Sequence, residues 1–197
     1  MPAETLFIGI GSPHGDDRLG WHVADALTER LQRAQGDLPG DKSLSENSEP
    51  LTPNPSPPRG EGSIRIGSKP AGLKSHAMPE ARVAIRKAAT PADVLDWLEG
   101  TSRLMICDAC RCGGPAGFAY RWIWPDPAIE LAHGSGSHDL GLAGVLELAA
   151  RLERLPPAVV VWGVELDSVE PQDTFSNSVR AHLPGIVDTI WRDLGHA

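Results

Sequence analysis

The sequence predicts an α/β fold with three layers, in which a mostly parallel, twisted sheet lies between helices. Short apolar runs, typical of buried strands, alternate along the 197 residues with segments whose apolar residues recur at helical spacing. Hydrophobic residues make up 41% and charged residues 22%, as in ordinary globular proteins. Such alternation is typical of a parallel sheet covered on both faces, in which ligands bind beyond the carboxyl ends of the strands.

Five segments are expected to form strands: 5–9, 82–85, 104–107, 118–123 and 158–164. The last of these, AVVVWGV, gives the strongest signal for a central strand, whereas 118–123 is rich in aromatic residues and is expected to be more exposed.

Four segments are expected to form helices: 17–33, 90–98, 140–152 and 178–194. Thr90 is expected to be an N-cap with Pro91 in the first turn. Pro184 is expected to interrupt the last helix, because proline has no backbone N–H to donate to the preceding turn.

Residues 36–80 differ in composition from the rest of the chain. They contain 8 of the 18 prolines and 7 serines, but no Phe, Trp or Tyr. Such a segment cannot bury enough apolar surface to offset the entropy lost on ordering. We therefore expect a disordered Pro/Ser/Gly-rich insert within a single domain spanning 1–197; a proline-rich docking peptide is the alternative.

The charge and composition of the chain disfavour several classes of partner. There are 26 acidic and 18 basic residues, a net charge of −8, which argues against nucleic-acid binding. No apolar run approaches the length of about 18 residues that indicates a membrane span. Without a secretory signal or a disulfide framework among the three cysteines, the cytoplasm is the expected location.

The loop after the first expected strand, 9–20, contains a GxG sequence and two adjacent acids, Asp16 and Asp17. We do not expect a dinucleotide site, because His14 stands near the place of the third glycine and two carboxylates would repel a pyrophosphate. The two acids also suit the N-cap and first turn of a helix. We expect one of them to take that role and the other to serve a metal or a proton.

Asp108 comes at the end of the buried run 104–107. A carboxylate is costly to bury without a partner. Asp108 is therefore expected either to cap a turn or pair with Arg111, or to face the same crevice as Asp17.

The three cysteines lie close together in the sequence. Cys107 is expected to be a core residue. The CxxCxC pattern has no second Cys or His pair at zinc-finger distance, so a structural zinc site is weakly indicated and Cys110 and Cys112 are expected to be incidental.

His138 lies in a loop of small residues that leads into the helix at 140–152. The positive end of the helix dipole disfavours the imidazolium, and a neutral imidazole is what a divalent metal binds. A lone histidine is more often structural. Together with Asp17 and Asp108, however, it completes a ligand set of two carboxylates and one imidazole, which suits a borderline ion such as nickel or zinc.

Four motifs taken in order resemble those of the hydrogenase maturation proteases, the endopeptidases of nickel–iron hydrogenase assembly. The resemblance covers 5–35 and 83–194. It is carried by Ile8-Gly9-Ile10-Gly11 with Asp16-Asp17 and Gly20, by Asp108-Ala109, by Ser137-His138-Asp139-Leu140-Gly141-Leu142, and by Trp162-Gly163-Val164-Glu165 with Pro171 and Ser176.

The resemblance implies a phosphorylase/hydrolase-like fold and a peptidase of the aspartic-type grouping. Such an enzyme removes a C-terminal peptide from the nickel-loaded precursor of a hydrogenase large subunit, its protein partner, and thereby activates the hydrogenase. The implied metal ligands are Asp17, Asp108 and His138. The nickel is supplied by the precursor and is not permanently bound. These three residues and Asp16 form the implied catalytic set, in which Asp16 is a candidate to orient or deprotonate the attacking water. A monomer is expected.

The sequence departs from the family pattern in two places. Ser12 stands where the family usually has Asn, and the run 87–91, KAATP, replaces a glycine-rich Asp-x-Gly-Thr loop that is thought to receive the substrate. Partner choice and activity therefore stay open. The alternatives are a non-catalytic nickel-sensing or scaffold protein of the same fold, and a zinc hydrolase with its own metal.

Overall fold

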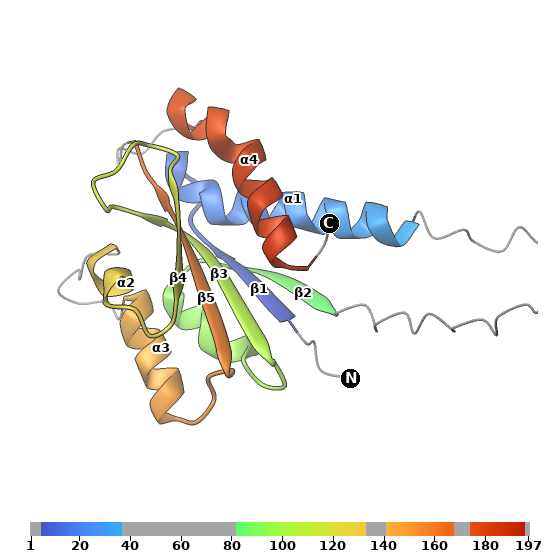
Figure 1. Ribbon diagram of the computed structural model, residues 1–197, viewed down its shortest axis with the longest axis vertical. Helices are drawn as coiled ribbons and strands as arrows, with labels where there is room; N and C mark the ends of the chain where they lie inside the picture. The colour runs from blue at the N-terminus through green and yellow to red at the C-terminus, as the bar shows by residue number, and fades with distance from the viewer. Residues whose placement is uncertain (1–4, 37–81, 133–140, 168–173, 196–197) are drawn as a thin grey trace, which may run out of the picture. The chain divides into compact units, whose positions relative to one another are not determined.

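Five strands form one sheet in the order β2-β1-β3-β5-β4 (Figure 1). The computed structural model describes residues 5–36, 82–132, 141–167 and 174–195. Within them β1, β2, β3 and β5 are parallel, and β4 pairs antiparallel with β5 at one edge. The strands are β1 (Thr5–Ile10), β2 (Val83–Ala88), β3 (Arg103–Cys110), β4 (Ala119–Ile123) and β5 (Ala158–Glu165).

Helices cover both faces of this sheet. On one face lie α1 (Leu19–Gly36), which the 3-10 helix η1 (Gly15–Arg18) precedes, and α4 (Asn177–Asp193). On the other lie the 3-10 helix η2 (Pro91–Trp97), α2 (Pro127–Ala132) and α3 (Leu142–Arg151) (Figure 1). The expected α/β architecture, a mostly parallel sheet between helices, is confirmed.

The alternation of side chains along the strands divides the core into two halves. On β3, Met105 and Cys107 pack against the α1 and α4 layer, whereas Leu104 and Ile106 pack against the η2, α2 and α3 layer. A strand buried on both faces reads as a continuous apolar run, which is why the sequence shows these strands clearly. Cys107 is fully buried, as expected of a core residue.

Two local expectations are corrected, and one helix was not expected. The segment after Thr90 forms a 3-10 helix, α2 had no counterpart in the expected elements, and Pro184 lies inside a continuous α4. Leu183 and Ile186, on either side of Pro184, are both buried. Burial of that apolar face stabilises the helix despite the missing N–H donor.

After β1 the chain forms β2 on one side of β1, and it then forms β3 on the other side of β1. Strand β1 lies between β2 and β3, so the connections diverge at the β1–β3 boundary. Such a switch point opens a crevice beyond the carboxyl ends of the two strands, which is where open α/β sheets bind ligands.

The segment 36–80, expected to be an insert, lies outside the described residues except for Gly36, the last residue of α1. None of the helices in the described part of the chain is long and apolar enough to cross a membrane.

Candidate active site

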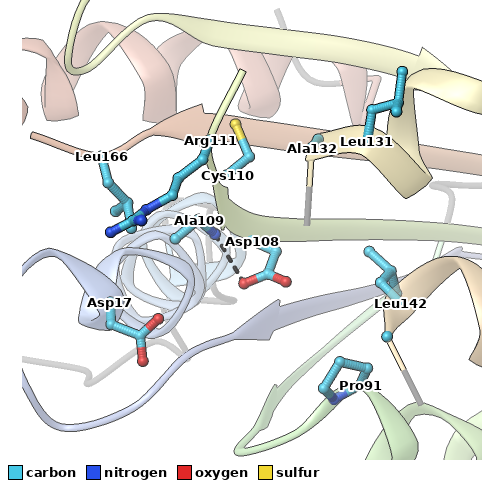
Figure 2. A pocket seen from close by; sticks show the side chains of 11 residues that line it. Asp17, Pro91, Asp108, Ala109, Cys110, Arg111, Leu131, Ala132, Leu142 and Leu166 are labelled. Atoms are coloured by element: carbon cyan, nitrogen blue, oxygen red, sulfur yellow. Dashed lines mark hydrogen bonds between the residues drawn. The ribbon is translucent and has the colours of Figure 1, made fainter. Parts of the chain in front are cut away.

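A pocket of about 450 Å³ opens at the carboxyl ends of the parallel strands (Figure 2). Its walls come from segments far apart in sequence: the loop after β1, the start of η2, the end of β3, the residue after β5, and the facing ends of α2 and α3. The residues that line it are Asp17, Pro91, Asp108, Ala109, Cys110, Arg111, Leu131, Ala132, Gly141, Leu142 and Leu166.

Close backbone packing fixes the position of the loop that carries Asp17. A Cβ on Gly20 would lie 2.0 Å from the Ile10 carbonyl oxygen, and a Cβ on Gly11 would lie 2.3 Å from the Asp17 carbonyl oxygen. Only glycine permits these approaches. The Ser12 N–H also donates to the Asp17 carbonyl oxygen at 3.1 Å. The glycines of this loop therefore serve helix–strand packing and place the exposed Asp17 carboxylate at the pocket.

Asp108 reaches the same pocket from within β3. The strand runs on to Cys110 because β5 pairs with it as far as Glu165, so Asp108 lies inside the strand and not after it. Its side chain is buried, and its Oδ1 accepts the Ala109 N–H at 2.8 Å (Figure 2). Asp108 therefore lines the same crevice as Asp17, which was one of the two expectations for it.

Asp16 occupies a different environment from its neighbour. It is 6% exposed and does not line the pocket. Its Oδ1 accepts the Ser176 N–H at 2.7 Å and its Oδ2 lies 3.4 Å from the Asp167 nitrogen, so it connects η1 to the chain after β5. The Ser176 hydroxyl in turn accepts the Val179 N–H at the start of α4. These contacts favour an anchoring role for Asp16; its role with water stays a prediction.

His138, the third expected ligand, lies outside the described residues. The described residues nearest to it along the chain on either side of that segment, Ala132 and Gly141, both line the pocket.

The run that departs from the family pattern also borders the pocket, through Pro91. The Asp93 carboxylate holds this turn by accepting the N–H groups of Ala89 and Thr90 at 2.8 and 2.9 Å. The hydrogen bond from Thr90 keeps the pKa of Asp93 below its ordinary value. The run 87–91, which stands in place of the family's glycine-rich loop, is therefore ordered and contributes to the pocket wall.

Two pocket residues had no part in the expected site. Arg111 was considered only as a partner of Asp108, and its backbone N–H donates to the Ala132 carbonyl at 2.9 Å. Leu131, on the unexpected α2, is 80% exposed. Neither position shows a pattern in the sequence, since each depends on how α2 packs beside the end of β3.

The lining carries more negative than positive formal charge. Among the described lining residues Arg111 is the only cation, against Asp17 and Asp108. Two carboxylates at the end of a rigid sheet, in an open pocket, are suited to a divalent cation that keeps other ligands of its own.

The comparisons with known proteins agree on one family. The family model described as HycI, hydrogenase maturation protease, matches residues 73–193. That range includes Asp108 and His138, whereas Asp17 precedes it. No curated protein sequence matches the chain.

Several solved structures share the fold. The hydrogenase 2 maturation peptidase from Thaumarchaeota archaeon SCGC_AB-539-E09 is 22% identical, with a TM-score of 0.54 over 98% of this chain and 99% of that one. The hydrogenase maturating endopeptidase HybD from E. coli is 17% identical, with a TM-score of 0.61 over 97% and 91%. The [NiFe] hydrogenase maturation protease HycI from Thermococcus kodakarensis KOD1 is 16% identical, with a TM-score of 0.55 over 99% and 94%.

Sequence identities this low show that the solved structures share the fold and no more. The assignment to a family depends on the family model, which spans more than half of the sequence. The resemblance expected from the motifs is confirmed: this chain belongs to the hydrogenase maturation protease family.

Proposed function

We propose that this protein is an endopeptidase that removes a C-terminal peptide from the nickel-loaded precursor of a nickel–iron hydrogenase large subunit. One observation carries the proposal: in a member of this family, Asp17 from η1, after β1, and Asp108 from the last residues of β3 line one pocket at the switch point of the sheet. We assign both carboxylates, together with His138, to binding nickel that is already held by the precursor.

The pocket suits a metal that arrives with its own ligands. Three protein donors leave coordination positions open, as recognition of an ion inside another protein requires. The exposed Leu131 and the guanidinium of Arg111 offer the precursor an apolar contact and a charged one. These side chains give the site a surface for a protein substrate beside its metal-binding carboxylates.

A thiol nucleophile is disfavoured, which supports the aspartic-type grouping. Cys110 is the cysteine that lines the pocket, but it is buried, and Figure 2 shows its sulfur directed away from the Asp108 carboxylate. Burial, together with the neighbouring Cys112, raises the pKa of the Cys110 thiol. A thiol that stays protonated is a poor nucleophile, so attack by water is the better assignment.

The remaining groups position this chemistry. We assign Asp16 to holding η1, and with it Asp17, against the residues that precede α4.

The three cysteines are free thiols, which suits a reducing cytoplasm. We propose that the protein acts there as a monomer.

The test uses purified protein with the large-subunit precursor, in nickel-loaded and nickel-free forms, followed by the intact mass of the precursor. We expect the nickel-loaded form alone to lose mass, and to lose it at its C-terminus. A nickel-loaded precursor that keeps its full mass would refute the protease function. If that precursor nevertheless bound the protein tightly, the non-catalytic scaffold would be the better assignment.

A further inference from the structure

A second cluster of potential metal ligands lies beside the pocket and plays no part in the proposed protease chemistry. It consists of Cys110, Cys112 and Glu165, whose sulfur and carboxylate donor atoms all lie within 4.8 Å of one another. The sequence indicated a metal site here only weakly, and Cys110 and Cys112 were expected to be incidental, because the CxxCxC pattern has no second ligand pair nearby and Glu165 comes 53 residues after Cys112. The sheet brings the three together, since Cys110 is the register partner of Glu165.

The distance between the two sulfurs fits a shared metal ion. They lie 3.8 Å apart. Two thiolates on a tetrahedral zinc, with Zn–S bonds of about 2.3 Å, are held about 3.8 Å apart. A disulfide would instead need a separation of about 2.05 Å. The Cys112 thiol donates a hydrogen bond to the Cys110 sulfur at this separation, so an ion would replace that proton with little movement of the two sulfurs.

The carboxylate of Glu165, the third potential ligand of the cluster, is held rigidly. It is 4% exposed, and its two oxygens accept the N–H groups of Cys112 and Gly113 at 2.9 and 3.0 Å. The Tyr120 hydroxyl also hydrogen-bonds this carboxylate. Two carboxylate oxygens offer about four lone pairs, so the three donors leave one for an ion. The charge of a buried carboxylate is costly, and a bound cation would compensate it directly.

The loop around these ligands closes tightly on them. Gly113 has φ +80°, a conformation that glycine adopts without strain, and a Cβ on Gly114 would lie 2.1 Å from the Tyr120 hydroxyl. Tyr120 is itself fixed by stacking on Trp122, with ring centroids 5.4 Å apart. Cys112 is exposed, so an ion can enter from solvent.

We propose that Cys110, Cys112 and Glu165 form a thiophilic metal site that binds one Zn²⁺ per chain, with the fourth position taken by solvent. Thiolate donors select zinc over harder ions such as magnesium. Each thiol releases its proton to the buffer as its sulfur binds the ion, and no oxidation state changes. The ion joins the end of β3 to the end of β5, and thereby stiffens the pocket wall that includes Cys110 and Leu166.

The test uses the purified full-length chain, reduced and metal-free, titrated with Zn²⁺ and, as a spectroscopic probe, with Co²⁺. We expect one ion per chain, a thiolate-to-cobalt charge-transfer band, and loss of that band when zinc is added. Cys112→Ser, at an exposed position, is expected to abolish the band, and Glu165→Gln to weaken zinc binding by about tenfold or more.

Two matched controls separate this site from the rest of the molecule. Cys107→Ala removes a thiol from the same strand on the opposite face, and Asp17→Asn removes a carboxylate from the proposed nickel-binding set; both are expected to keep the band. The proposal is overturned if the wild-type chain gives no thiolate–cobalt band, or if the band survives in Cys112→Ser. Neither result depends on whether the protein cleaves a hydrogenase precursor.

Discussion

The two ends of the sheet hold their carboxylates in different ways. At the end where β3 begins, Asp193 of α4 accepts hydrogen bonds from Arg103, Arg121 and Trp162 at 3.1, 2.9 and 3.2 Å. At the end where the parallel strands finish, Asp16 and Asp108 accept hydrogen bonds from backbone N–H groups. Asp17 is exposed there and lines the pocket.

The difference separates structural acids from candidate functional ones. A guanidinium carries a full positive charge, so two arginines neutralise Asp193 and connect α4 to the sheet. A backbone N–H stabilises a carboxylate without cancelling its charge. The acids that line the pocket, Asp17 and Asp108, are the ones we propose to meet a cation brought by a partner. Mutations at the two ends of the sheet are therefore expected to have different consequences.

The largest effect is expected at the pocket. Asp108→Asn and Asp17→Asn should each lower precursor processing by more than about 100-fold. Loss of a group that only hydrogen-bonds to a metal ligand costs roughly 10- to 100-fold, and loss of a ligand itself should cost more. The variants should fold as the wild type does. The measurement is the rate at which nickel-loaded precursor is shortened, checked by circular dichroism of each variant. Processing at the wild-type rate by either variant would remove that carboxylate from the proposed ligand set.

Asp16→Asn tests the anchoring role. The amide cannot accept both hydrogen bonds that the carboxylate accepts, so we expect the free energy of unfolding to fall by about 1–3 kcal/mol. Processing by the folded protein should fall less than in Asp17→Asn. Urea unfolding and processing rates measure the two effects. The opposite pattern, unchanged stability with a rate lowered by about 100-fold or more, would favour Asp16 as the general base.

Asp193→Asn is expected to destabilise the fold without affecting the chemistry. Losing the charged acceptor of two arginines and an indole should lower the free energy of unfolding by about 1–3 kcal/mol. Processing per folded molecule should match that of the wild type, since Asp193 lies at the other end of the sheet. A specific loss of activity in a fully folded Asp193→Asn protein would contradict the division between the two ends.

The same residue predicts part of the pH dependence of stability. Burial alone would raise the pKa of Asp193, but Arg121 and Arg103 hold it below its ordinary value of 3.8. Its contribution to stability is therefore fully present above about pH 4 and is lost as the pH falls through the lowered pKa. Urea unfolding between pH 6 and 3 should show a steeper loss in the wild type than in Asp193→Asn. Parallel curves would show that the ion pairs contribute nothing.

The smallest effect is expected from an acid on the surface. Asp25 pairs with Lys87 at 2.9 Å, with both side chains largely exposed. Exposed ion pairs contribute about 0–1 kcal/mol, so Asp25→Asn should change stability by less than about 1 kcal/mol and leave processing unchanged. This variant removes the same charge as Asp17→Asn. If it also abolished processing, net charge rather than the pocket geometry would explain the effect.

The sequence was sufficient to predict the sheet and the edge where the site lies. Buried strands such as 158–164 are visible as apolar runs, and the carboxyl ends of parallel strands meet at one edge of a sheet, which brought Asp17 and Asp108 together in the prediction. The helix after Thr90 was predicted, but not its 3-10 form, because the side-chain pattern of a short helix does not fix its hydrogen bonding.

The rest depended on contacts between distant residues. The residues alone left open which of Asp16 and Asp17 faces the ligand, and only the family resemblance selected Asp17. The different environment of Asp16 depends on hydrogen bonds from Asp167 and Ser176, about 150 residues further along the chain. Arg111 gained its place in the pocket from the packing of α2. Glu165 lies beside Cys110 because the two residues are register partners on β5 and β3. A search of the sequence for closely spaced ligands does not detect such pairing.

The central claim is that Asp17 and Asp108, at the carboxyl end of the sheet, act on nickel in the precursor, whereas Asp193 at the other end is structural. It is tested most directly by incubating nickel-loaded precursor with equal folded amounts of Asp108→Asn and Asp193→Asn and measuring the intact mass of the precursor. The account predicts a shortened precursor with Asp193→Asn and a full-length precursor with Asp108→Asn. A shortened precursor with Asp108→Asn would contradict it.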